Sequence, residues 1–181
     1  DETWLRRHVG DQNVVITDVT AGEGVLAVMG PKARAVMQAV SPNDFGNDTN
    51  PFGTARQIEL GMGLARVHRV SYVGELGWEI YVSADMAVHA FETLWQAGQA
   101  QGMALCGMHM MDSCRFEKGF RHFGHDITCA DHVLEAGLGF AVKTDNHAFL
   151  GRAAVLEKRQ TGSELSFILT SEPTRLVMIT E

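Results

Sequence analysis

The sequence predicts an α+β fold in which helices pack against an antiparallel sheet. Two observations support this prediction. Strand-like segments follow one another through tight glycine-containing connections, as in β-hairpins. Helical segments then follow these strands, which gives a repeated strand-strand-helix order. Hydrophobic residues make up 45% of the 181 residues and charged residues 20%, which are ordinary values for a globular domain.

The first part of the chain contains a predicted hairpin and a predicted helix. Residues 13–20 are rich in β-branched side chains, which favour a strand. A turn at residues 21–24 and an apolar run at residues 25–29 complete the predicted hairpin. Gly30-Pro31 then opens a helix, because proline fits the first helical turn. The apolar stripe of this helix consists of Val36, Met37 and Val40.

Three further strands are predicted in the middle of the chain. Residues 41–53 contain prolines, asparagines, aspartates and glycines, which is typical of a loop. Strands are expected at residues 55–60, 64–72 and 78–83. In the last of these, apolar and polar side chains alternate, so one face is predicted to be buried. That apolar face consists of Trp78, Ile80 and Val82, and the opposite face of Glu79, Tyr81 and Ser83.

The rest of the chain is predicted to be mixed helix and strand. Apolar residues at helical spacing after position 86 predict a helix with this stripe: Ala87, Val88, Phe91, Leu94, Trp95 and Gly98. The other expected elements are a helix at 107–118, a strand at 138–143, a helix at 150–158, and strands at 166–170 and 176–181.

Charge and hydropathy exclude two classes of partner. Lys and Arg number 15 against 22 Asp and Glu, which gives a formal charge of −7. We therefore expect neither a nucleic-acid-binding protein nor one that binds anionic membranes, since no basic excess is available to neutralise phosphates. No apolar stretch reaches the ~20 residues of a transmembrane helix.

The three cysteines and the first residues bear on the compartment. Cys106, Cys114 and Cys129 form no CxxC pair, so neither a disulfide framework nor a zinc ribbon is expected. A reducing compartment, the cytoplasm, is the simplest expectation. The polar start lacks a signal-peptide pattern and an initiator Met, so we expect a processed chain or a piece of a longer one.

Residues 71–81 contain the residue pattern that most strongly indicates a ligand-binding site. If Tyr72 and Glu79 flank the intervening loop in cross-strand register, both side chains project from one face of the sheet. A carboxylate can then accept two parallel N–H bonds from a flat amidine-like edge, such as that of a pterin or a guanine, while the aromatic ring covers its face. The alternative is a hairpin with turn glycines and a solvated glutamate.

A second segment, residues 107–128, combines charge with histidines. Asp112 and Arg115 lie three apart on the predicted helix and can pair. Arg115, Lys118 and Arg121 form either part of a salt-bridged helix and loop or a binding site for a ligand carboxylate. No metal site is expected, because the spacings among the nearby cysteines and histidines fit no standard zinc pattern. The histidines concerned are His109, His122, His125 and His132.

Four segments, in order, carry a family resemblance: YVGELGWEIY (72–81), DSCRFEKGFRHFGHDIT (112–128), LEAGLGFAVK (134–143) and FLGRAAV (149–155). Together they resemble the folate-binding region of the glycine-cleavage T-protein (aminomethyltransferase) superfamily, over roughly residues 20–160. Among its branches, the dimethylglycine and sarcosine dehydrogenases and oxidases are the most similar. The resemblance implies that the predicted domain is the central part of a T-protein-like folate-binding fold.

The resemblance also implies site residues. Glu79 matches the family glutamate that binds the pteridine ring, and Tyr72 matches a tyrosine that lines the folate pocket. Arg115 matches a recurrent arginine, expected to be structural or to bind the folate tail. Met111 stands where T-proteins carry an arginine that contacts ligand, which favours the dimethylglycine and sarcosine branch.

A domain map follows from the resemblance. Residues 1–12 are expected to be a linker from a missing N-terminal part, 13–145 the folate-binding domain, and 146–181 the start of a truncated C-terminal segment. The family's catalytic aspartate is expected outside this chain, and Asp18, in the first predicted strand, does not match it. FAD is expected only in a domain outside the chain, because no GxGxxG follows a strand here.

The implied function is one-carbon transfer. Enzymes of this type demethylate an N-methyl amine such as dimethylglycine or sarcosine and yield 5,10-methylenetetrahydrofolate. The expected partners are tetrahydrofolate, a small N-methyl amine and the remaining domains of the parent polypeptide, and the fragment alone is expected to be inactive. The alternatives are a glycine-cleavage aminomethyltransferase, a non-catalytic folate-binding module, a domain that has lost its ligand, and a folate-dependent demethylase of sulfonium substrates.

Overall fold

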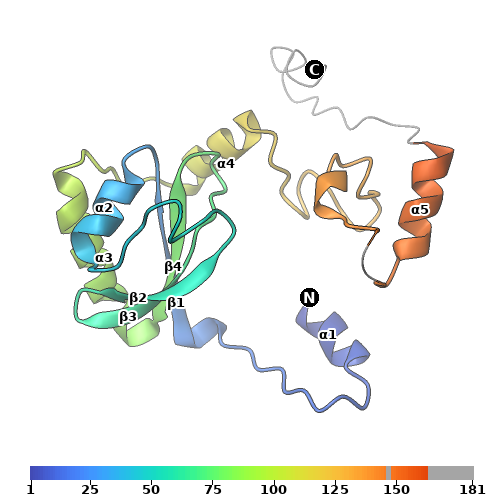
Figure 1. Ribbon diagram of the computed structural model, residues 1–181, viewed down its shortest axis with the longest axis horizontal. Coiled ribbons are helices and arrows are strands. Elements are labelled where there is room, and N and C mark those ends of the chain that lie inside the picture. The colour runs from blue at the N-terminus through green and yellow to red at the C-terminus, as the bar shows by residue number, and fades with distance from the viewer. Residues whose placement is uncertain (146–147, 163–181) are drawn as a thin grey trace. The chain divides into compact units, whose positions relative to one another are not determined.

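The computed structural model describes residues 1–145 and 148–162 (Figure 1). The chain divides into two compact units, residues 1–118 and 119–181, and each is described here by itself. Within the described residues, no helix combines the length and the apolar character needed to cross a membrane.

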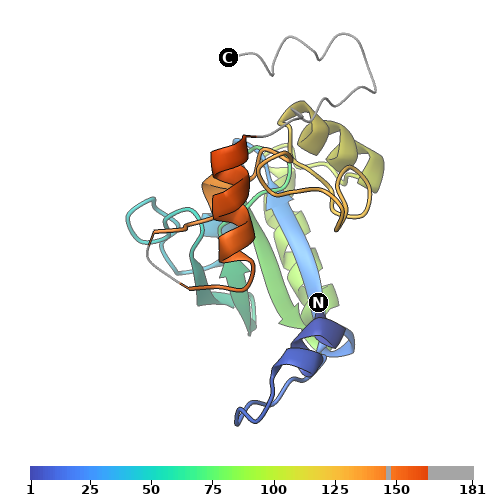
Figure 2. The ribbon, with the colours of Figure 1, turned by 90° about the vertical axis from the view of Figure 1, so that its right-hand side faces the viewer.

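The first unit is built on a four-stranded antiparallel sheet (Figures 1 and 2). Its strands are β1 (Glu23–Met29), β2 (Ala55–Leu60), β3 (Gly63–His68) and β4 (Gly77–Ser83), in the order β1-β4-β3-β2. The predicted α+β class with an antiparallel sheet is confirmed. Strand β4 is paired along both of its edges, since β1 and β3 flank it.

Two helices cover one face of this sheet. Helices α2 (Ala33–Val40) and α3 (Ala87–Gln99) pack against each other and against β4 (Figure 1). The predicted alternation of residues 78–83 is confirmed, because the side chains on its apolar face are at most 4% exposed. The core around them consists of Val28, Ala33, Val36, Met37, Phe45, Ile58, Leu60, Ala65, Val67, Trp78, Ile80, Val82, Ala90 and Leu94.

The apolar stripe of α3 differs in part from its prediction. Val88 is 68% exposed and Phe91 38% exposed, whereas Ala90 and Leu94 are buried. The buried residues of α3 are Ala90, Leu94 and Gly98. The last two belong to the predicted stripe, whereas Ala90 lies on the core-facing side in place of Val88 and Phe91. The last helix of the first unit, α4 (Met108–Glu117), confirms the prediction for residues 107–118.

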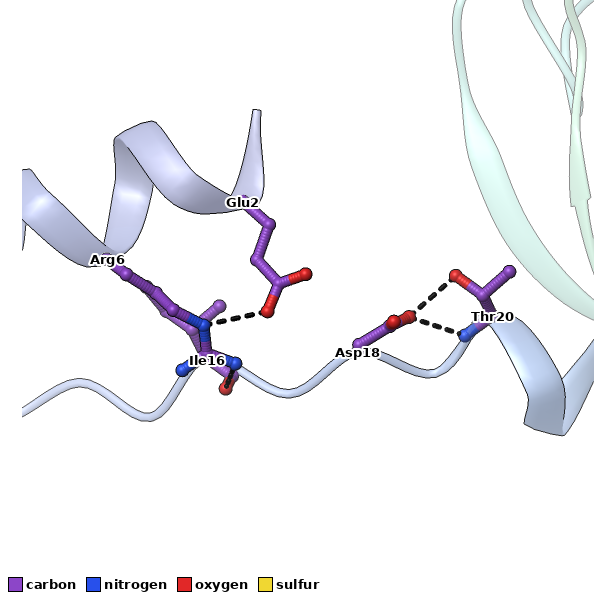
Figure 3. Close-up of polar contacts among 5 residues, drawn as sticks. All are labelled: Glu2, Arg6, Ile16, Asp18 and Thr20. Carbon is purple, nitrogen blue, oxygen red and sulfur yellow. Dashed lines mark hydrogen bonds and ion pairs between the residues drawn. The ribbon is translucent and has the colours of Figure 1, made fainter.

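The strand predicted at residues 13–20 is wrong. Residues 12–19 belong to no helix or strand, and a 3₁₀ turn, η1 (Thr20–Gly22), precedes β1. The Asp18 carboxylate accepts hydrogen bonds from the backbone N–H and the hydroxyl of Thr20, at 2.9 and 2.6 Å (Figure 3). These bonds lower the pKa of Asp18. Local bonds of this kind compete with strand pairing. Here they hold the end of the segment in a turn, although its β-branched composition favours a strand.

A short helix precedes this extended segment. Helix α1 (Glu2–His8) contains an ion pair between Glu2 and Arg6 at 2.7 Å (Figure 3). Arg6 Nη2 also donates to the backbone carbonyl of Ile16 at 3.0 Å. The side chain of Arg6 thus ties the extended segment to α1.

Among its described residues, the second unit has one α-helix and local turns. Helix α5 (Arg152–Thr161) corresponds to the helix predicted at residues 150–158. The strand predicted at 138–143 is wrong, because a 3₁₀ turn, η3 (Gly139–Ala141), occupies it. Backbone bonds such as Leu138 N–H to Val133 O, at 2.9 Å, satisfy this segment locally instead of through a strand partner. The strands predicted at 166–170 and 176–181 lie outside the described residues.

A buried amide anchors the loop of residues 41–54 beneath the sheet. Asn50 is 0% exposed, and its Oδ1 accepts from the Trp78 indole N–H at 2.5 Å. Its Nδ2 donates to Thr54 Oγ1 at 3.0 Å, and its backbone carbonyl accepts from Arg69 Nη1 at 2.6 Å. The network satisfies the buried Trp78 donor, so a central core residue depends on a loop residue.

Replacing Asn50 with Ala should therefore lower the free energy of unfolding by about 2–3 kcal/mol, because the Trp78 N–H is left buried without an acceptor. Urea unfolding followed by tryptophan fluorescence measures this, since Trp4, Trp78 and Trp95 all belong to the first unit. Asn13→Ala is the control, because Asn13 is exposed in the irregular segment and its change should stay within about 0.5 kcal/mol. Equal unfolding free energies for the two variants would contradict the role of Asn50.

Candidate functional site

The face of the sheet opposite the core carries a row of polar side chains. Residues that are partners across an antiparallel ladder share a face. Glu79 lies between Ala27 on β1 and His68 on β3, and Tyr81 lies between Val25 and Arg66. We call this the outer face. It consists of Glu23, Val25, Ala27 and Met29 on β1, Glu79, Tyr81 and Ser83 on β4, Leu64, Arg66 and His68 on β3, and Ala55, Gln57 and Glu59 on β2.

Glu79 is the acidic group at the centre of this face. Its side chain is half-buried, and Oε2 accepts a hydrogen bond from the Tyr81 hydroxyl at 2.9 Å. On the β1 side its cross-strand neighbour is Ala27, which is exposed and small. The Ala27 side chain ends at its Cβ, whereas the Glu79 carboxylate lies two bonds beyond its own Cβ, so Ala27 does not cover it and Glu79 remains partly exposed. It can act there as a hydrogen-bond acceptor for paired N–H donors.

Tyr81 is held between charged and aromatic neighbours. The rings of Tyr81 and His68 lie 4.7 Å apart, at 34° to each other. The Arg66 guanidinium lies 5.1 Å from the centre of the Tyr81 ring and forms an ion pair with Glu23 at 3.0 Å. The hydrogen bond to Glu79, with burial and the Glu79 charge, raises the pKa of the Tyr81 phenol, which therefore remains a donor at neutral pH.

The cross-strand register expected for Tyr72 and Glu79 is wrong. Strand β3 ends at His68, so His68 occupies the position across from Glu79. Residues 69–76 form an irregular connection instead of a tight hairpin, and Tyr72 lies half-buried within it. The sequence continues the strand pattern to residue 72, but the Arg69 backbone pairs with Thr54 beyond the ladder and the chain then bends.

The connection that carries Tyr72 lies against the end of α4. Gly74 has φ +72°, and a Cβ atom there would collide with the Lys118 side chain. Lys118 follows directly after α4, the helix of Arg115. The structure therefore brings the loop of Tyr72 next to the end of α4, although Tyr72, Glu79 and Arg115 lie on three separate elements.

Arg115 is largely buried. Its side chain is 6% exposed and pairs with Asp112 at 3.1 Å, as its spacing predicts. Its guanidinium also lies 5.9 Å from the Phe116 ring. The side chain is therefore held within the protein, and the two expected roles of Arg115, structural or toward a folate tail, stay predictions. Arg121, the third member of the predicted basic cluster, belongs to the second unit.

Two residues of the outer face were not singled out as site residues from the sequence. Tyr81 could have been found, because it lies two positions after Glu79 in an alternating strand and so shares its face. His68 could not, because its position depends on the register across an eight-residue connection. In the part of the chain that the structure describes, no group of three or more His, Cys, Asp or Glu side chains is arranged to hold a metal ion.

Comparison with known proteins identifies the family. The model of the GCVT N-terminal domain matches residues 1–146. The 4-methylaminobutanoate oxidase (formaldehyde-forming) of Paenarthrobacter nicotinovorans is 42% identical over 162 residues, which are 89% of this chain and 20% of that protein. Human mitochondrial sarcosine dehydrogenase is 35% identical over 81% of this chain and 16% of its own length. An aminomethyltransferase of Bacillus pumilus (strain SAFR-032) is 33% identical over 93% of this chain and 46% of its own length.

A solved structure shares the fold. Heterotetrameric sarcosine oxidase from Corynebacterium sp. U-96 aligns with a TM-score of 0.50 and 23% identity, over 59% of this chain and 53% of that one. The chain spans between about a sixth and a half of the length of the curated relatives named above. The chain belongs to the GCVT N-terminal domain family, which confirms the predicted resemblance to the T-protein superfamily.

Proposed function

We propose that this chain is the folate-binding part of an enzyme that demethylates an N-methyl amine and passes the one-carbon unit to tetrahydrofolate. The observation that carries the proposal is the half-buried carboxylate of Glu79 on the outer face, in the segment that resembles the pterin-binding motif. Family membership supports it, and so do the relatives, which are named as enzymes acting on methylated amines or transferring aminomethyl groups.

The residues present fit a reduced pterin. Glu79 is a half-buried acceptor with one oxygen engaged by Tyr81 and the other oxygen available. A carboxylate in this state can accept the adjacent N–H groups of a pterin edge. Tyr72 offers an aromatic ring from the neighbouring connection, as the motif implies. When bound, tetrahydrofolate would supply the nitrogen that accepts the one-carbon unit.

In this proposal the chain binds the folate and orients its pterin ring. Glu79 would fix the pterin edge, and the strands on both sides of β4 would hold Glu79 in place. Such positioning lowers the entropic cost of bringing the folate and its reaction partner together. The catalytic aspartate and the flavin expected from the resemblance are proposed for other parts of a longer polypeptide.

The amine branch is favoured over a glycine-cleavage aminomethyltransferase. The chain is 42% identical to an oxidase named for a methylamino acid, whereas the sarcosine dehydrogenase and the aminomethyltransferase compared are 35% and 33% identical. Met111, in place of the T-protein arginine, agrees with this preference. We therefore propose an N-methyl amine as the substrate class and keep aminomethyl transfer as the second candidate.

Glu79→Gln should weaken the binding of 5-formyltetrahydrofolate by roughly 100-fold, because the amide cannot accept both pterin N–H bonds. Isothermal titration calorimetry of the 181-residue chain measures this. Glu59→Gln is the matched control, since Glu59 is exposed on β2, two strands from β4 on the same face, and its variant should bind normally. Equal affinity of the Glu79 variant and the unsubstituted chain would contradict the assignment of the pterin to Glu79.

The natural polypeptide that contains this sequence should release formaldehyde when it oxidises its N-methyl amine without folate. Adding tetrahydrofolate should lower the free formaldehyde by several fold, because the folate captures the carbon. A colorimetric formaldehyde assay with sarcosine, dimethylglycine and 4-methylaminobutanoate measures both the substrate class and the capture. Formaldehyde yields that are unchanged by tetrahydrofolate would contradict folate transfer, and activity with a glycine-cleavage carrier alone would support the second candidate.

A further inference from the structure

We propose that Tyr81 is a positioning residue that holds the Glu79 carboxylate in the orientation that binds the ligand. This inference rests on the proposed function of Glu79 and adds a residue that acts through it. The contact on which it depends is the 2.9 Å hydrogen bond from the Tyr81 hydroxyl to Glu79 Oε2. The two residues lie two positions apart on β4, so both project from the same face.

The phenol itself is fixed in place by its neighbours on β3. The His68 ring lies 4.7 Å from the Tyr81 ring, and the Arg66 guanidinium lies 5.1 Å from its centre. Glu23 on β1 in turn pairs with Arg66 at 3.0 Å, across the strand that carries Tyr81. Three strands thus contribute to the position of one hydroxyl group. A donor held in this way limits the rotation of the carboxylate that accepts its bond.

The bond also distinguishes the two oxygens of Glu79. Oε2 uses one of its lone pairs for Tyr81, and Oε1 keeps its full capacity. A ligand with two adjacent N–H donors can still bind both oxygens, and it meets a carboxylate that is already oriented. Preorganisation of this kind raises affinity because less side-chain freedom is lost on binding. Tyr81 therefore needs no contact with the ligand to affect its affinity.

The protonation of Tyr81 fits this role. The hydrogen bond to Glu79 is the main cause that raises the pKa of the phenol, while the Arg66 charge acts in the opposite direction. The groups that face the phenol are Glu79 on its own strand, Arg66 and His68 on β3, and Glu23 on β1. The raised pKa keeps the hydroxyl protonated at neutral pH, so it can act there as a donor to Glu79.

A double-mutant cycle in the 181-residue chain tests the inference. Titrations with 5-formyltetrahydrofolate compare the unsubstituted chain, Tyr81→Phe, Glu79→Gln and the double variant. Tyr81→Phe should weaken binding by about tenfold when Glu79 is present, because a hydrogen bond to a charged group is lost. With Gln at position 79, the same substitution should change the affinity by less than about twofold.

The outcomes separate the inference from the proposed function. Normal binding by Tyr81→Phe, with loss of binding in Glu79→Gln, would overturn the inference and leave the proposed function in place. An equal loss from Tyr81→Phe in both backgrounds would also overturn it, since Tyr81 would then act independently of Glu79. Absence of saturable binding by the unsubstituted chain would contradict the proposed function and the inference with it.

The pKa of Tyr81 provides a second test, because a purely structural role of Tyr81 would not make this pKa depend on Glu79. The chain has only two tyrosines, Tyr72 and Tyr81, so Tyr72→Phe leaves Tyr81 as the sole tyrosinate signal in the ultraviolet. In that background the pKa of Tyr81 should lie above the ordinary value of about 10. Adding Glu79→Gln should lower it, and Arg66→Gln should raise it further.

Circular dichroism at each pH confirms that the chain stays folded during this titration. An unchanged pKa in the Glu79→Gln variant would show that the bond between Tyr81 and Glu79 is absent in solution, and would overturn the inference. Because folding raises the pKa of Tyr81, its protonated phenol stabilises the folded state below pH ~10. This contribution to stability is lost as the pH rises through the folded-state pKa of Tyr81.

Discussion

The pairing of β4 on both edges is the constraint on which the rest of the first unit depends. A strand held between β1 and β3 cannot slip by one residue without turning every side chain to the other face. On one side β4 contributes Trp78, Ile80 and Val82 to the core, each at most 4% exposed. The position of Glu79 and Tyr81 on the outer face is therefore fixed by the burial of their immediate neighbours.

The loop of residues 41–54 links the core to the outer face, in addition to strand β4. Trp78 lies directly before Glu79, and its indole N–H is satisfied by Asn50, which is fully buried. The same loop residue binds Arg69 at the start of the connection that carries Tyr72. Asn50 thus supports the strand that bears the candidate ligand-binding carboxylate through its side-chain amide, and the first residue of the connection beside it through its backbone carbonyl.

Periodicity predicted β2 and β4 well, because alternation and glycine turns specify them locally, but it extended β3 to residue 72, whereas the strand ends at His68. It failed at residues 13–20, where Asp18 binds Thr20 in a local turn, and at residues 138–143, where local backbone hydrogen bonds replace strand pairing. The motif led to Glu79 through family resemblance. Tyr81 follows from the alternation of β4, but His68 could not be predicted, because the register that places it opposite Glu79 depends on where β3 ends.

The ladder between β1 and β4 also has a consequence for how the domain folds. It joins Glu23 to Ser83 and Met29 to Gly77, whereas β2, β3 and β4 follow one another closely along the chain. Contacts between residues far apart in sequence cost more loop-closure entropy and slow folding. A meander of β2, β3 and β4 is therefore the more local nucleus. We therefore expect β1 to join after this meander, so that the surroundings of Glu79, with Ala27 beside it, are completed late in folding.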